Sequence, residues 1–338
     1  MDSPLTFEVK GSAPLTIRSP EHGDVGAIAK LHSRVWRRPL PEEYEQVSWS
    51  YRPVFEGKAP ALIALTSTGV VVGTRPVLPW RLSTANEKPL LAGQLHGTAV
   101  APELRRRGLF SFLTQSLVEE LTARQFDLIF NVSVPAARAG NEKLGWDYGR
   151  GLRRYVFARP PTRKSGHQRD RAMATTPVGA CADQDLYALL EPSSSRSATE
   201  RVRTQWTPEV AAWRLARPSA GYLVTEDPAG HRLLTRVMTN GGRRMLTLGT
   251  VSTPVPSASI LRRLVRSAMA ESETSLATSI SSVASPLSKA LVRIGFVPNP
   301  RRPNLNLGVR WLQPLADGDY PLDPKTNWDL RGIDIDTF

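Results

Sequence analysis

The chain has 338 residues and 41% of them are hydrophobic, which is enough for two ordinary domains with packed cores and argues against wholesale disorder. The formal net charge is +13, but the excess is dispersed and not interleaved with aromatic residues, so it favours a solvated basic surface over a nucleic-acid partner. A single cysteine, Cys181, excludes an internal disulfide and a cysteine-rich metal site. No signal peptide is recognisable and no apolar run reaches transmembrane length, so we expect a cytoplasmic protein without a membrane partner.

The first half of the chain mixes strand and helix patterns. Apolar residues recur every three or four positions in the expected helices and form short apolar runs in the expected strands. The predicted elements are a strand at 15–18, helices at 25–36 and 42–51, strands at 61–66, 70–78 and 90–100, a helix from 109 to about 124, a strand at 127–132, a helix at 135–144 and a strand at 147–157. This order predicts an α/β protein with a mixed sheet and helices on its faces.

The second half repeats this order. The sequence Lys-Leu-Gly-Trp at 143–146 has a counterpart in Arg-Ile-Gly-Phe at 293–296, which predicts a divergent tandem repeat. A polar, basic stretch at 159–175 is expected to be a linker or surface loop. The tail at 312–338 is acidic and irregular, so we expect it to lie outside the core and to drape over a groove.

The stretch from Val100 to Leu113 carries the clearest chemical signal. It leaves an apolar strand, passes through three arginines and Gly108, and enters a helix. The free backbone N–H groups and the positive end of the helix dipole make such a turn an anion site, and the arginines add charge where a phosphate would lie. The equivalent turn of the second half, Pro254 to Ser257, has prolines that lack N–H donors, so only the first half is expected to bind an anion there.

The pattern V-x-P-x-x-R-x-x-G-L at 100–109, together with N-E-K-L-G-W at 141–146, resembles the GNAT superfamily of CoA-dependent N-acyltransferases. The resemblance covers 15–158 well and 176–311 only by element order. It implies two GNAT-like domains, each a mixed, mostly antiparallel sheet with a central parallel pair splayed around CoA. The implied organisation is an acyltransferase domain at 1–158, a linker at 159–175, a degenerate domain at 176–311 and a tail at 312–338.

The resemblance also implies where the co-substrate CoA binds. The turn would hold the pyrophosphate, the strand at 98–100 would pair with the pantetheine arm, and Asn131 would bond its amides or the acceptor. The expected CoA-binding residues are Thr98, Ala99, Val100, Arg105, Arg106, Arg107, Gly108, Leu109, Phe110, Ser111 and Asn131. Phe110 departs from the family, which usually has a small residue at this position.

The candidate catalytic residues lie on the preceding strand and beyond it. Gln94 and His96 share one face of the strand because side chains alternate. Of the two, only His96 can act as a base, directly or through water, although a buried structural histidine explains it equally well. Asn141 stands where the family often has a tyrosine that acts as the general acid. In its place, Tyr148 or a water molecule would protonate the leaving thiolate.

Four aromatic residues are candidates for acceptor binding because the elements that carry them line the acceptor side of the site in this fold. They are Trp36, Trp49, Tyr51 and Trp80. Such rings could contact a bound sugar or aryl amine, but aromatic residues also commonly pack in the hydrophobic core or at its edge. The glutamates at 42, 43 and 45 could hold a cationic amine, and an exposed helix face explains them as well.

The favoured function is transfer of an acetyl group from acetyl-CoA to a primary amine of a small molecule, such as an amino sugar or an aminoglycoside-like compound in antibiotic biosynthesis or resistance. The alternatives are another reaction of a CoA thioester, including malonyl-CoA decarboxylation, and a CoA-binding module without activity. No metal cofactor and no nucleic-acid partner are expected, and a homodimer stays open.

Overall fold

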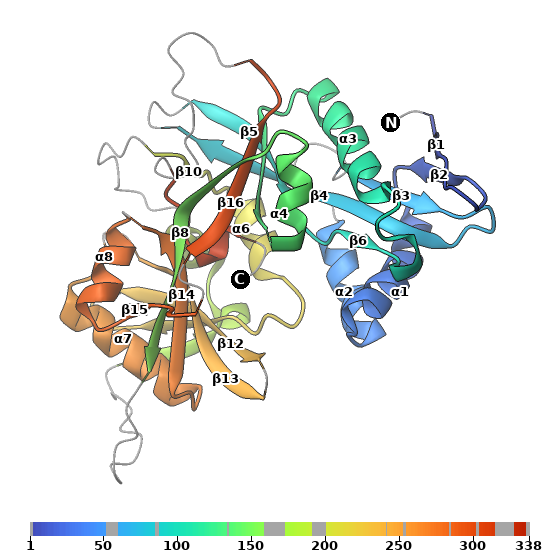
Figure 1. Cartoon of the computed structure of the whole chain (residues 1–338). Helices are drawn as coiled ribbons and strands as arrows, with labels where there is room; N and C mark the ends of the chain where they lie inside the picture. The colour runs from blue at the N-terminus through green and yellow to red at the C-terminus, as the bar shows by residue number, and fades with distance from the viewer. Residues whose placement is uncertain are drawn as a thin grey trace.

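The computed structural model describes residues 3–51, 60–84, 88–133, 135–158, 173–190, 201–240, 242–252, 255–283, 285–301, 304–314 and 328–335. Most of the predicted linker, much of the predicted tail and Pro254 lie outside these residues. The chain forms two lobes that share one sheet (Figure 1).

The first lobe follows the predicted order of strands and helices, with short additions. Its elements are β1 (Leu5–Phe7), β2 (Leu15–Arg18), η1 (His22–Asp24), α1 (Val25–Trp36), α2 (Leu40–Ser50), β3 (Ala61–Leu65), β4 (Val71–Ser83), β5 (Pro89–Leu95), β6 (Ala99–Val100), η2 (Pro102–Leu104), α3 (Leu109–Ala123), β7 (Leu128–Ser133), α4 (Pro135–Glu142) and β8 (Asp147–Ala158). The predicted hairpin at 67–69 joins β3 to β4, which pair antiparallel.

The second lobe also consists of helices and strands. Its elements are β9 (Ala174–Pro177), η3 (Val178–Ala180), α5 (Asp183–Leu190), β10 (Arg203–Thr204), α6 (Pro208–Leu215), β11 (Leu223–Glu226), β12 (Arg232–Asn240), β13 (Arg243–Val251), α7 (Ala258–Glu271), β14 (Leu276–Ser282), α8 (Pro286–Arg293), β15 (Val297–Pro298), β16 (Asn304–Trp311) and η4 (Gly332–Asp334). The predicted mixed α/β sheet is therefore confirmed.

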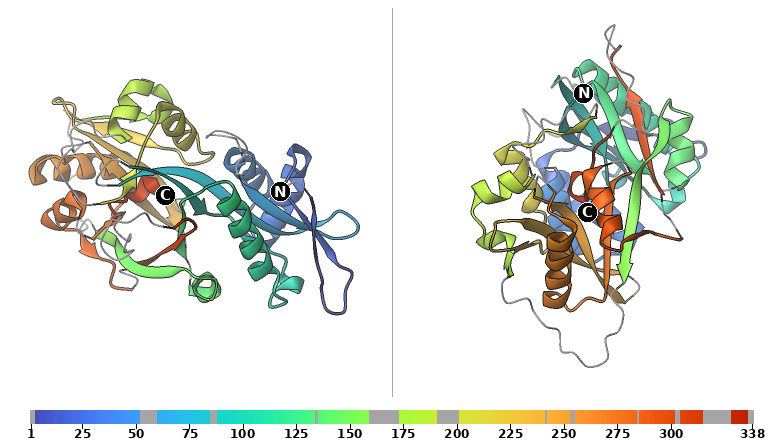
Figure 2. Two further views of the ribbon diagram at one scale, coloured as in Figure 1. Left: turned by 90° about the horizontal axis from the view of Figure 1, so that it is seen from above. Right: turned by 90° about the vertical axis from the view of Figure 1, so that its left-hand side faces the viewer.

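Neighbouring residues of β4 show how the helices cover the sheet. A Cβ added to Gly73 would touch the side chains of Leu109 and Leu113 on α3. The next residue, Thr74, points the other way and its hydroxyl bonds the ring of His32 on α1. Because successive side chains of a strand alternate, α1 and α2 lie on one face and α3 on the other (Figure 2, left).

The two lobes exchange strands. The strand order runs β5-β7-β16-β8-β14-β13, so β16, from near the end of the chain, lies between β7 and β8 of the first half. β8 pairs with β16 from Asp147 to Arg153 and with β14 of the second lobe from Leu152 to Ala158. Figure 1 shows β8 in green running down from the first lobe beside β14. The sheet is therefore continuous across the predicted domain boundary.

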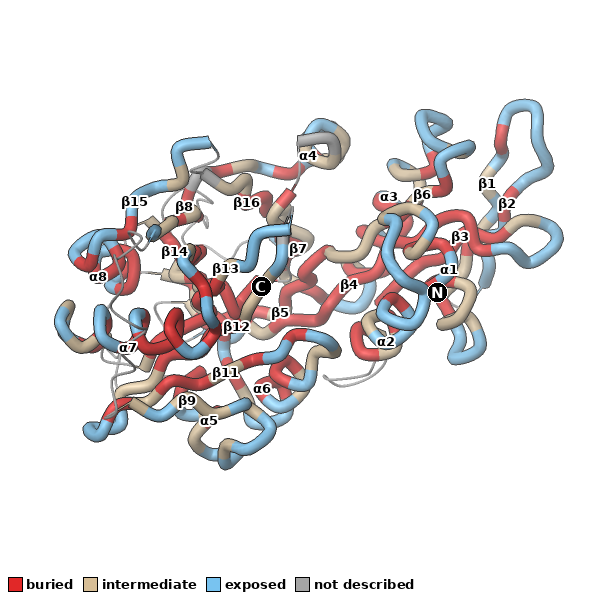
Figure 3. Tube along the Cα trace, turned by 90° about the horizontal axis from the view of Figure 1, so that it is seen from below, coloured by how far each residue is buried: buried red, intermediate tan, exposed pale blue. Residues whose placement is uncertain are grey.

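The expectation that the tail lies outside the core is wrong for 328–335. Trp328, Leu330, Ile333 and Ile335 are all 2% exposed or less and belong to the core cluster between the lobes. The acidic Asp334 tolerates burial because its carboxylate accepts hydrogen bonds from the backbone and the side chain of Arg331. Figure 3 colours the chain by burial, with the buried stretches of β4, β5 and β12 in red.

We expect Gly308→Ala to destabilise the protein because β16 packs tightly against β8. A Cβ at Gly308 would lie 2.5 Å from Cε1 of Tyr148 and 2.6 Å from its Cζ. Overpacking of this kind costs about 1–3 kcal/mol, measurable as a lower free energy of unfolding in urea. Gly179→Ala is the control, since a Cβ there meets nothing within 4 Å. Equal unfolding free energies for the two variants would contradict this packing.

Candidate functional site

A β-bulge interrupts the strand that leads to the anion turn. β4 pairs with β5 as far as Val77 opposite Leu95, and it pairs with β6 from Thr74 opposite Ala99. Three residues, His96 to Thr98, therefore face two residues of β4, Arg75 and Pro76. Gly97 takes a φ of 51°, a backbone conformation that glycine adopts without steric cost. The bulge bends the chain, a common device for aiming side chains at a functional site.

Beside the bulge, the parallel strands β5 and β7 separate. Their pairing ends at Gln94 opposite Phe130, although both chains continue. Four buried polar atoms around this opening have no hydrogen-bond partner within the described ranges: Nε of Arg75, Oε1 of Gln94, Nε2 of His96 and Oδ1 of Asn131. Buried polar atoms normally find partners, so this opening suits a ligand that carries amide and carbonyl groups.

The anion turn has the geometry that the sequence predicts. Arg106 and Gly108 take positive φ angles of 61° and 88°, and Gly108 caps α3. The backbone N–H groups from Arg106 to Ser111 donate to no acceptor in the part of the chain that the structure describes. Arg105, Arg106 and Arg107 are exposed around them. Together, the N–H groups and the arginines fit a diphosphate.

Phe110, where the family usually has a small residue, packs against a glycine on α4. A Cβ at Gly140 would lie 2.9 Å from Cε1 of Phe110, so only glycine leaves room for this ring. The guanidinium carbon of Arg75 lies over the same ring, 4.9 Å from its centre. The bulky ring therefore fills a space between α3 and α4 that a small residue would leave open.

Arg75 is a buried cation between the bulge and α4. It is 2% exposed, donates to Oγ1 of Thr98 at 2.5 Å and to Oδ1 of Asn141 at 3.4 Å. Burial lowers its pKa to about 10, so it stays charged at neutral pH. No ion pair of Arg75 with a carboxylate occurs within the described ranges.

Tyr148 belongs to the same polar cluster. Its hydroxyl bonds Oγ of Ser133 at 2.7 Å and accepts a hydrogen bond from Nδ2 of Asn141 at 3.0 Å. Asn131 donates to the same serine at 2.7 Å, so the cluster connects β7, α4 and β8. The phenol thus lies next to Asn141, the residue at the place of the family tyrosine. A proton-donating role for Tyr148 stays a prediction.

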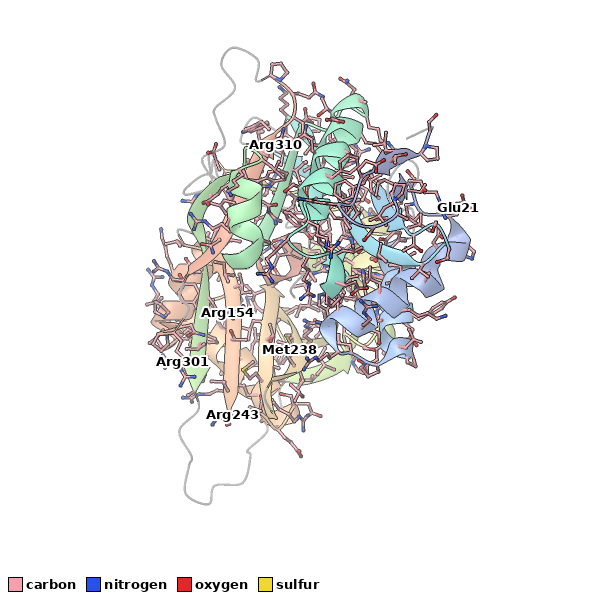
Figure 4. All side chains as sticks on the ribbon, turned by 45° about the vertical axis from the view of Figure 1, so that its right-hand side comes forward. Glu21, Arg154, Met238, Arg243, Arg301 and Arg310 are labelled. Carbon is pink, nitrogen blue, oxygen red and sulfur yellow. The ribbon has the colours of Figure 1, made fainter. Side chains whose placement is uncertain are left out.

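A cavity of about 370 Å³ opens on the other face of the bulge. The first lobe contributes α1, α2, β4 and the bulge, whereas the second lobe contributes Arg217, Arg236 and Met238. The lining residues are His32, Trp36, Arg38, Gln46, Val47, Trp49, Ser50, Leu78, His96, Gly97, Arg217, Arg236 and Met238. Met238 is labelled in Figure 4, near the middle of the molecule. The second lobe therefore forms one wall of the cavity.

The four predicted acceptor aromatics divide into two pairs. Trp36 and Trp49 line the cavity. Trp80 is 1% exposed in the core between the lobes, where its Nε1 donates to Thr204 at 3.0 Å. Tyr51 also lies outside the cavity lining, with a buried hydroxyl. Acceptor binding by Tyr51 or Trp80 stays a prediction that the cavity does not support.

Glu43 differs from the exposed glutamate that the sequence suggested. It is 1% exposed, accepts a hydrogen bond from Arg38 at 3.1 Å and lies 3.7 Å from Nδ1 of His32. His32 in turn bonds Thr74 at 3.0 Å, and Thr74 donates to the carbonyl of Gly97 at 3.3 Å. This chain of contacts anchors the bulge to α1 and α2.

Gln94 faces the tail of the chain. Its Nε2 donates to the carbonyl of Asp334 at 2.9 Å. Arg214 on α6 donates hydrogen bonds to the carbonyls of Ile333 and Ile335. The tail thus reaches the base of the opening between β5 and β7, where Gln94 has a structural partner.

Comparison with protein families gives a match in the first half of the chain. Residues 16–149 match the model of an acetyltransferase (GNAT) domain. This part of the chain is therefore similar in sequence to a GNAT domain. No curated protein matches the chain in sequence. Within residues 16–149 lie the turn before α3, the bulge and the separated parallel pair.

Solved structures show a related fold across both lobes. A GCN5-related N-acetyltransferase from Anabaena variabilis has a TM-score of 0.62 at 12% identity, covering 88% of this chain and 73% of that chain. Saccharomyces cerevisiae N-myristoyltransferase with bound myristoyl-CoA has a TM-score of 0.63 at 11% identity, with 98% and 91% covered. Eis1 from Mycobacterium abscessus has 0.52 at 16%, with 88% and 74% covered. At these identities the likeness concerns the fold.

No helix among the described residues is long and apolar enough to cross a membrane. No group of three or more His, Cys, Asp or Glu side chains that could hold a metal ion occurs in the same residues.

The stability of the protein is expected to fall in mild acid because of His32, which is buried, and His96, whose Nε2 is buried. Burial lowers the pKa of both His32 and His96 to about 3, with nearby cationic side chains adding to the effect. The unfolded chain binds protons below about pH 6.5, whereas the folded chain does so only near pH 3. Stability is therefore complete above pH 6.5 and declines as the pH falls, by up to roughly 1.4 kcal/mol per unit for each histidine.

The check is urea unfolding at pH 7 and pH 5. The difference in unfolding free energy should shrink in the double variant His32→Asn, His96→Asn. His22→Asn, which changes an exposed histidine, should keep the wild-type pH dependence. A double variant with the full wild-type dependence would rule out these histidines as its source.

Proposed function

We propose that the protein is an acyl-CoA-dependent N-acyltransferase that acetylates a primary amine of a small molecule in a ternary complex. The observation that carries the proposal is the bulge at His96 to Thr98. On one side of the bulge lie the anion turn and the separated strands, and on the other lies the 370 Å³ cavity. A donor and an acceptor bound on these two sides would meet at the bulge.

The donor side suits an acyl-CoA. The N–H groups from Arg106 to Ser111 would bind the diphosphate. β6 pairs with β4 on one edge, and a pantetheine arm would take its other edge like an added strand. The unpartnered Oδ1 of Asn131 would accept from a pantetheine amide. These residues therefore fit the co-substrate that the family uses.

The acceptor side would deliver a neutral amine. The amine nitrogen attacks the thioester carbonyl carbon, the carbon–sulfur bond breaks, and CoA leaves as a thiolate. His96 is neutral at neutral pH, because burial lowers its pKa to about 3, so its Nε2 can accept a hydrogen bond from the amine. An imidazole with so low a pKa is a weak base. The proton of the attacking amine would therefore pass to His96 or through His96 to water.

The leaving thiolate would lie on the Arg75 side of the bulge. Arg75 remains cationic there and donates to Oδ1 of Asn141, the residue that stands where the family often has a tyrosine. A fixed cation stabilises a developing thiolate without any proton transfer. Tyr148, one hydrogen bond from Asn141, would supply a proton to the thiolate or to a water molecule.

Gly108→Val tests the donor site. A β-branched residue is strained at a φ of 88°, so the substitution would distort the backbone that presents the N–H groups of the turn. Loss of two charge-assisted hydrogen bonds would weaken CoA binding by about 10²-fold, measured by isothermal titration calorimetry. Gly69→Val is the matched control, at a φ of 79° in an open hairpin. Equal CoA affinity of both variants would exclude the turn as the diphosphate site.

Arg75 also favours a second candidate, a donor whose acyl chain ends in a carboxylate, such as malonyl-CoA. A buried guanidinium with an unpartnered Nε and no carboxylate partner in the described residues suits such a group. Thiol release from malonyl-CoA and acetyl-CoA, each with and without amines, distinguishes the candidates. Release that ignores every amine would exclude the transferase function.

A further inference from the structure

Three of the polar atoms around the opening between β5 and β7 are both unpartnered and out of reach of solvent. Nε of Arg75, Oε1 of Gln94 and Oδ1 of Asn131 are buried, and none of them has a hydrogen-bond partner in the part of the chain that the structure describes. A pantetheine arm could bond these atoms only after the side chains that cover them have moved. The structure therefore shows the opening in a closed arrangement.

A donor reaches this opening from the face of the sheet that α3 and α4 share. Gly73 and Arg75 are two residues apart on β4, so the Cβ of Arg75 and a Cβ added to Gly73 point to the same face. The Cβ on Gly73 would touch Leu109 and Leu113 on α3, and Arg75 donates to Asn141 on α4. The cavity lined by α1 and α2 lies on the other face. A donor held by the anion turn therefore enters between the start of α3 and α4.

Two contacts connect α4 with the residues on the other side of this gap. In the first, the ring of Phe110 on α3 packs against Gly140 on α4, where an added Cβ would lie 2.9 Å from Cε1 and 3.4 Å from Cδ1 of the ring. In the second, Arg75 donates to Oδ1 of Asn141 at 3.4 Å, a long distance for such a hydrogen bond. The guanidinium carbon of Arg75 also lies 4.9 Å from the centre of the Phe110 ring. The ring and the guanidinium together close the gap.

Phe110 is suited to open and close this contact. Its side chain is only partly buried, so the ring can rotate toward solvent about χ1 and χ2 while the backbone N–H of the residue stays in place. Glycine lowers the stability of a helix interior relative to alanine, so Gly140 costs α4 some stability. Its presence leaves room for the ring, since even one methyl group at this position would be too close to it.

We propose that Phe110 is a gate for acyl-CoA: its ring closes the gap between α3 and α4, rotates away to admit the pantetheine arm, and returns over the bound arm. The inference rests on the proposed acyl-CoA site and identifies the residue that controls entry and release of the donor there. Closure also keeps water away from the thioester until the amine attacks. Phe110 acts here through its ring, whereas its backbone N–H belongs to the diphosphate site.

The first test measures how fast CoA binds, by stopped-flow mixing with a CoA that carries a fluorescent label on its adenine. A closed gate reduces the fraction of molecules that can bind, so Phe110→Ala should raise the association rate constant about 10-fold. The dissociation rate constant should rise too, because the bound arm leaves through the same gap. An association rate constant equal to or below that of the wild type would overturn the inference, because the loss of a ring that only packs α3 against α4 has that effect.

Phe112→Ala is the matched control on the same helix. The ring of Phe112 packs against Phe7 at a centroid distance of 5.0 Å. The substitution removes the same atoms as Phe110→Ala and leaves the contact between Phe110 and Gly140 in place, so wild-type rate constants are expected. An equally large increase in this control would overturn the gate, because a general loosening of α3 would then explain both results.

The second test alters the other side of the contact and does not depend on the stability of Phe110→Ala. Gly140→Ala puts a methyl group 2.9 Å from the ring edge, which blocks the closed position, while alanine favours the helix. The association rate constant should rise toward that of Phe110→Ala. The double variant should bind no faster than Phe110→Ala alone, because both changes act on one contact. Multiplied effects in the double variant, or slower association in Gly140→Ala, would contradict the gate.

The outcomes also separate the gate from the proposed function. If CoA binds to the wild type and more weakly to Gly108→Val, but Phe110→Ala leaves the association rate constant unchanged, the donor site stands and the gate is wrong. If CoA does not bind to the wild type at all, the proposed function and the gate both fail. Thermal unfolding of each variant shows whether it is folded, so that rate constants are compared only between folded proteins.

Discussion

A chain that ends at residue 158 is expected not to fold into a stable first lobe, although it contains every residue that matches the family model. The reason is that β16 lies between β7 and β8 and pairs with both. Without β16, β7 would have no antiparallel neighbour on that side, and an unpaired hydrophobic edge favours aggregation. Core residues Leu307 and Val309 would also be missing.

The measurement is the chemical unfolding of residues 1–158 and of the full chain, followed by circular dichroism and tryptophan fluorescence. The full chain should unfold cooperatively, whereas the fragment should aggregate or lack a cooperative transition. The matched control adds a separate peptide of residues 304–314 to the fragment, which should restore part of the transition. A fragment that unfolds cooperatively and binds CoA by itself would show that the strand exchange is dispensable.

His96→Ala is expected to lower kcat by about 10²-fold and to leave the affinity for acetyl-CoA within a factor of three. His96 lies on the bulge and lines the cavity, and its Nε2 is one of the buried polar atoms around the opening without a partner in the described residues. Removing the imidazole takes away the group that would receive the hydrogen of the amine, whereas the CoA turn is untouched. Steady-state kinetics with saturating acetyl-CoA provide the measurement.

Two comparisons make this result specific. His22→Ala, at an exposed histidine, should retain wild-type turnover. Because the pKa of His96 is about 3, the wild-type rate between pH 5 and pH 8 should follow deprotonation of the acceptor amine and show no additional step from His96. Full turnover of His96→Ala would mean that solvent alone receives the proton.

The sequence predicts the parts of the fold that depend on local signals. Each of these signals is encoded by residues that are close together in the sequence. Examples are the periodicity of α1, the hairpin at 67–69 and the Arg-Gly turn before α3, and all three features are present. Tail burial could not be predicted in this way. Asp329 and Asp334 make the segment look polar, although the apolar residues between them point into the core.

The cavity was predictable only in part, since its walls come from distant segments. Trp36, Trp49 and His96 were identified from the first lobe alone. Arg217 and Arg236 carry no local motif, and only the docking of the second lobe brings them to the bulge. That docking depends on contacts such as the reciprocal hydrogen bonds between the indoles and carbonyls of Trp49 and Trp213, at 2.8 and 3.1 Å.

The exchanged strands also constrain the order in which the protein can be made. During synthesis the ribosome releases β7 and β8 long before it reaches β16 at residue 304. At about 5–20 residues per second, the residues from 158 to 304 take roughly 7 to 30 s to appear. Throughout that interval the nascent first lobe exposes the edge that β16 will later fill. Folding of the two lobes is therefore completed together, after the last strand emerges, and chaperones have a defined period in which to protect that edge.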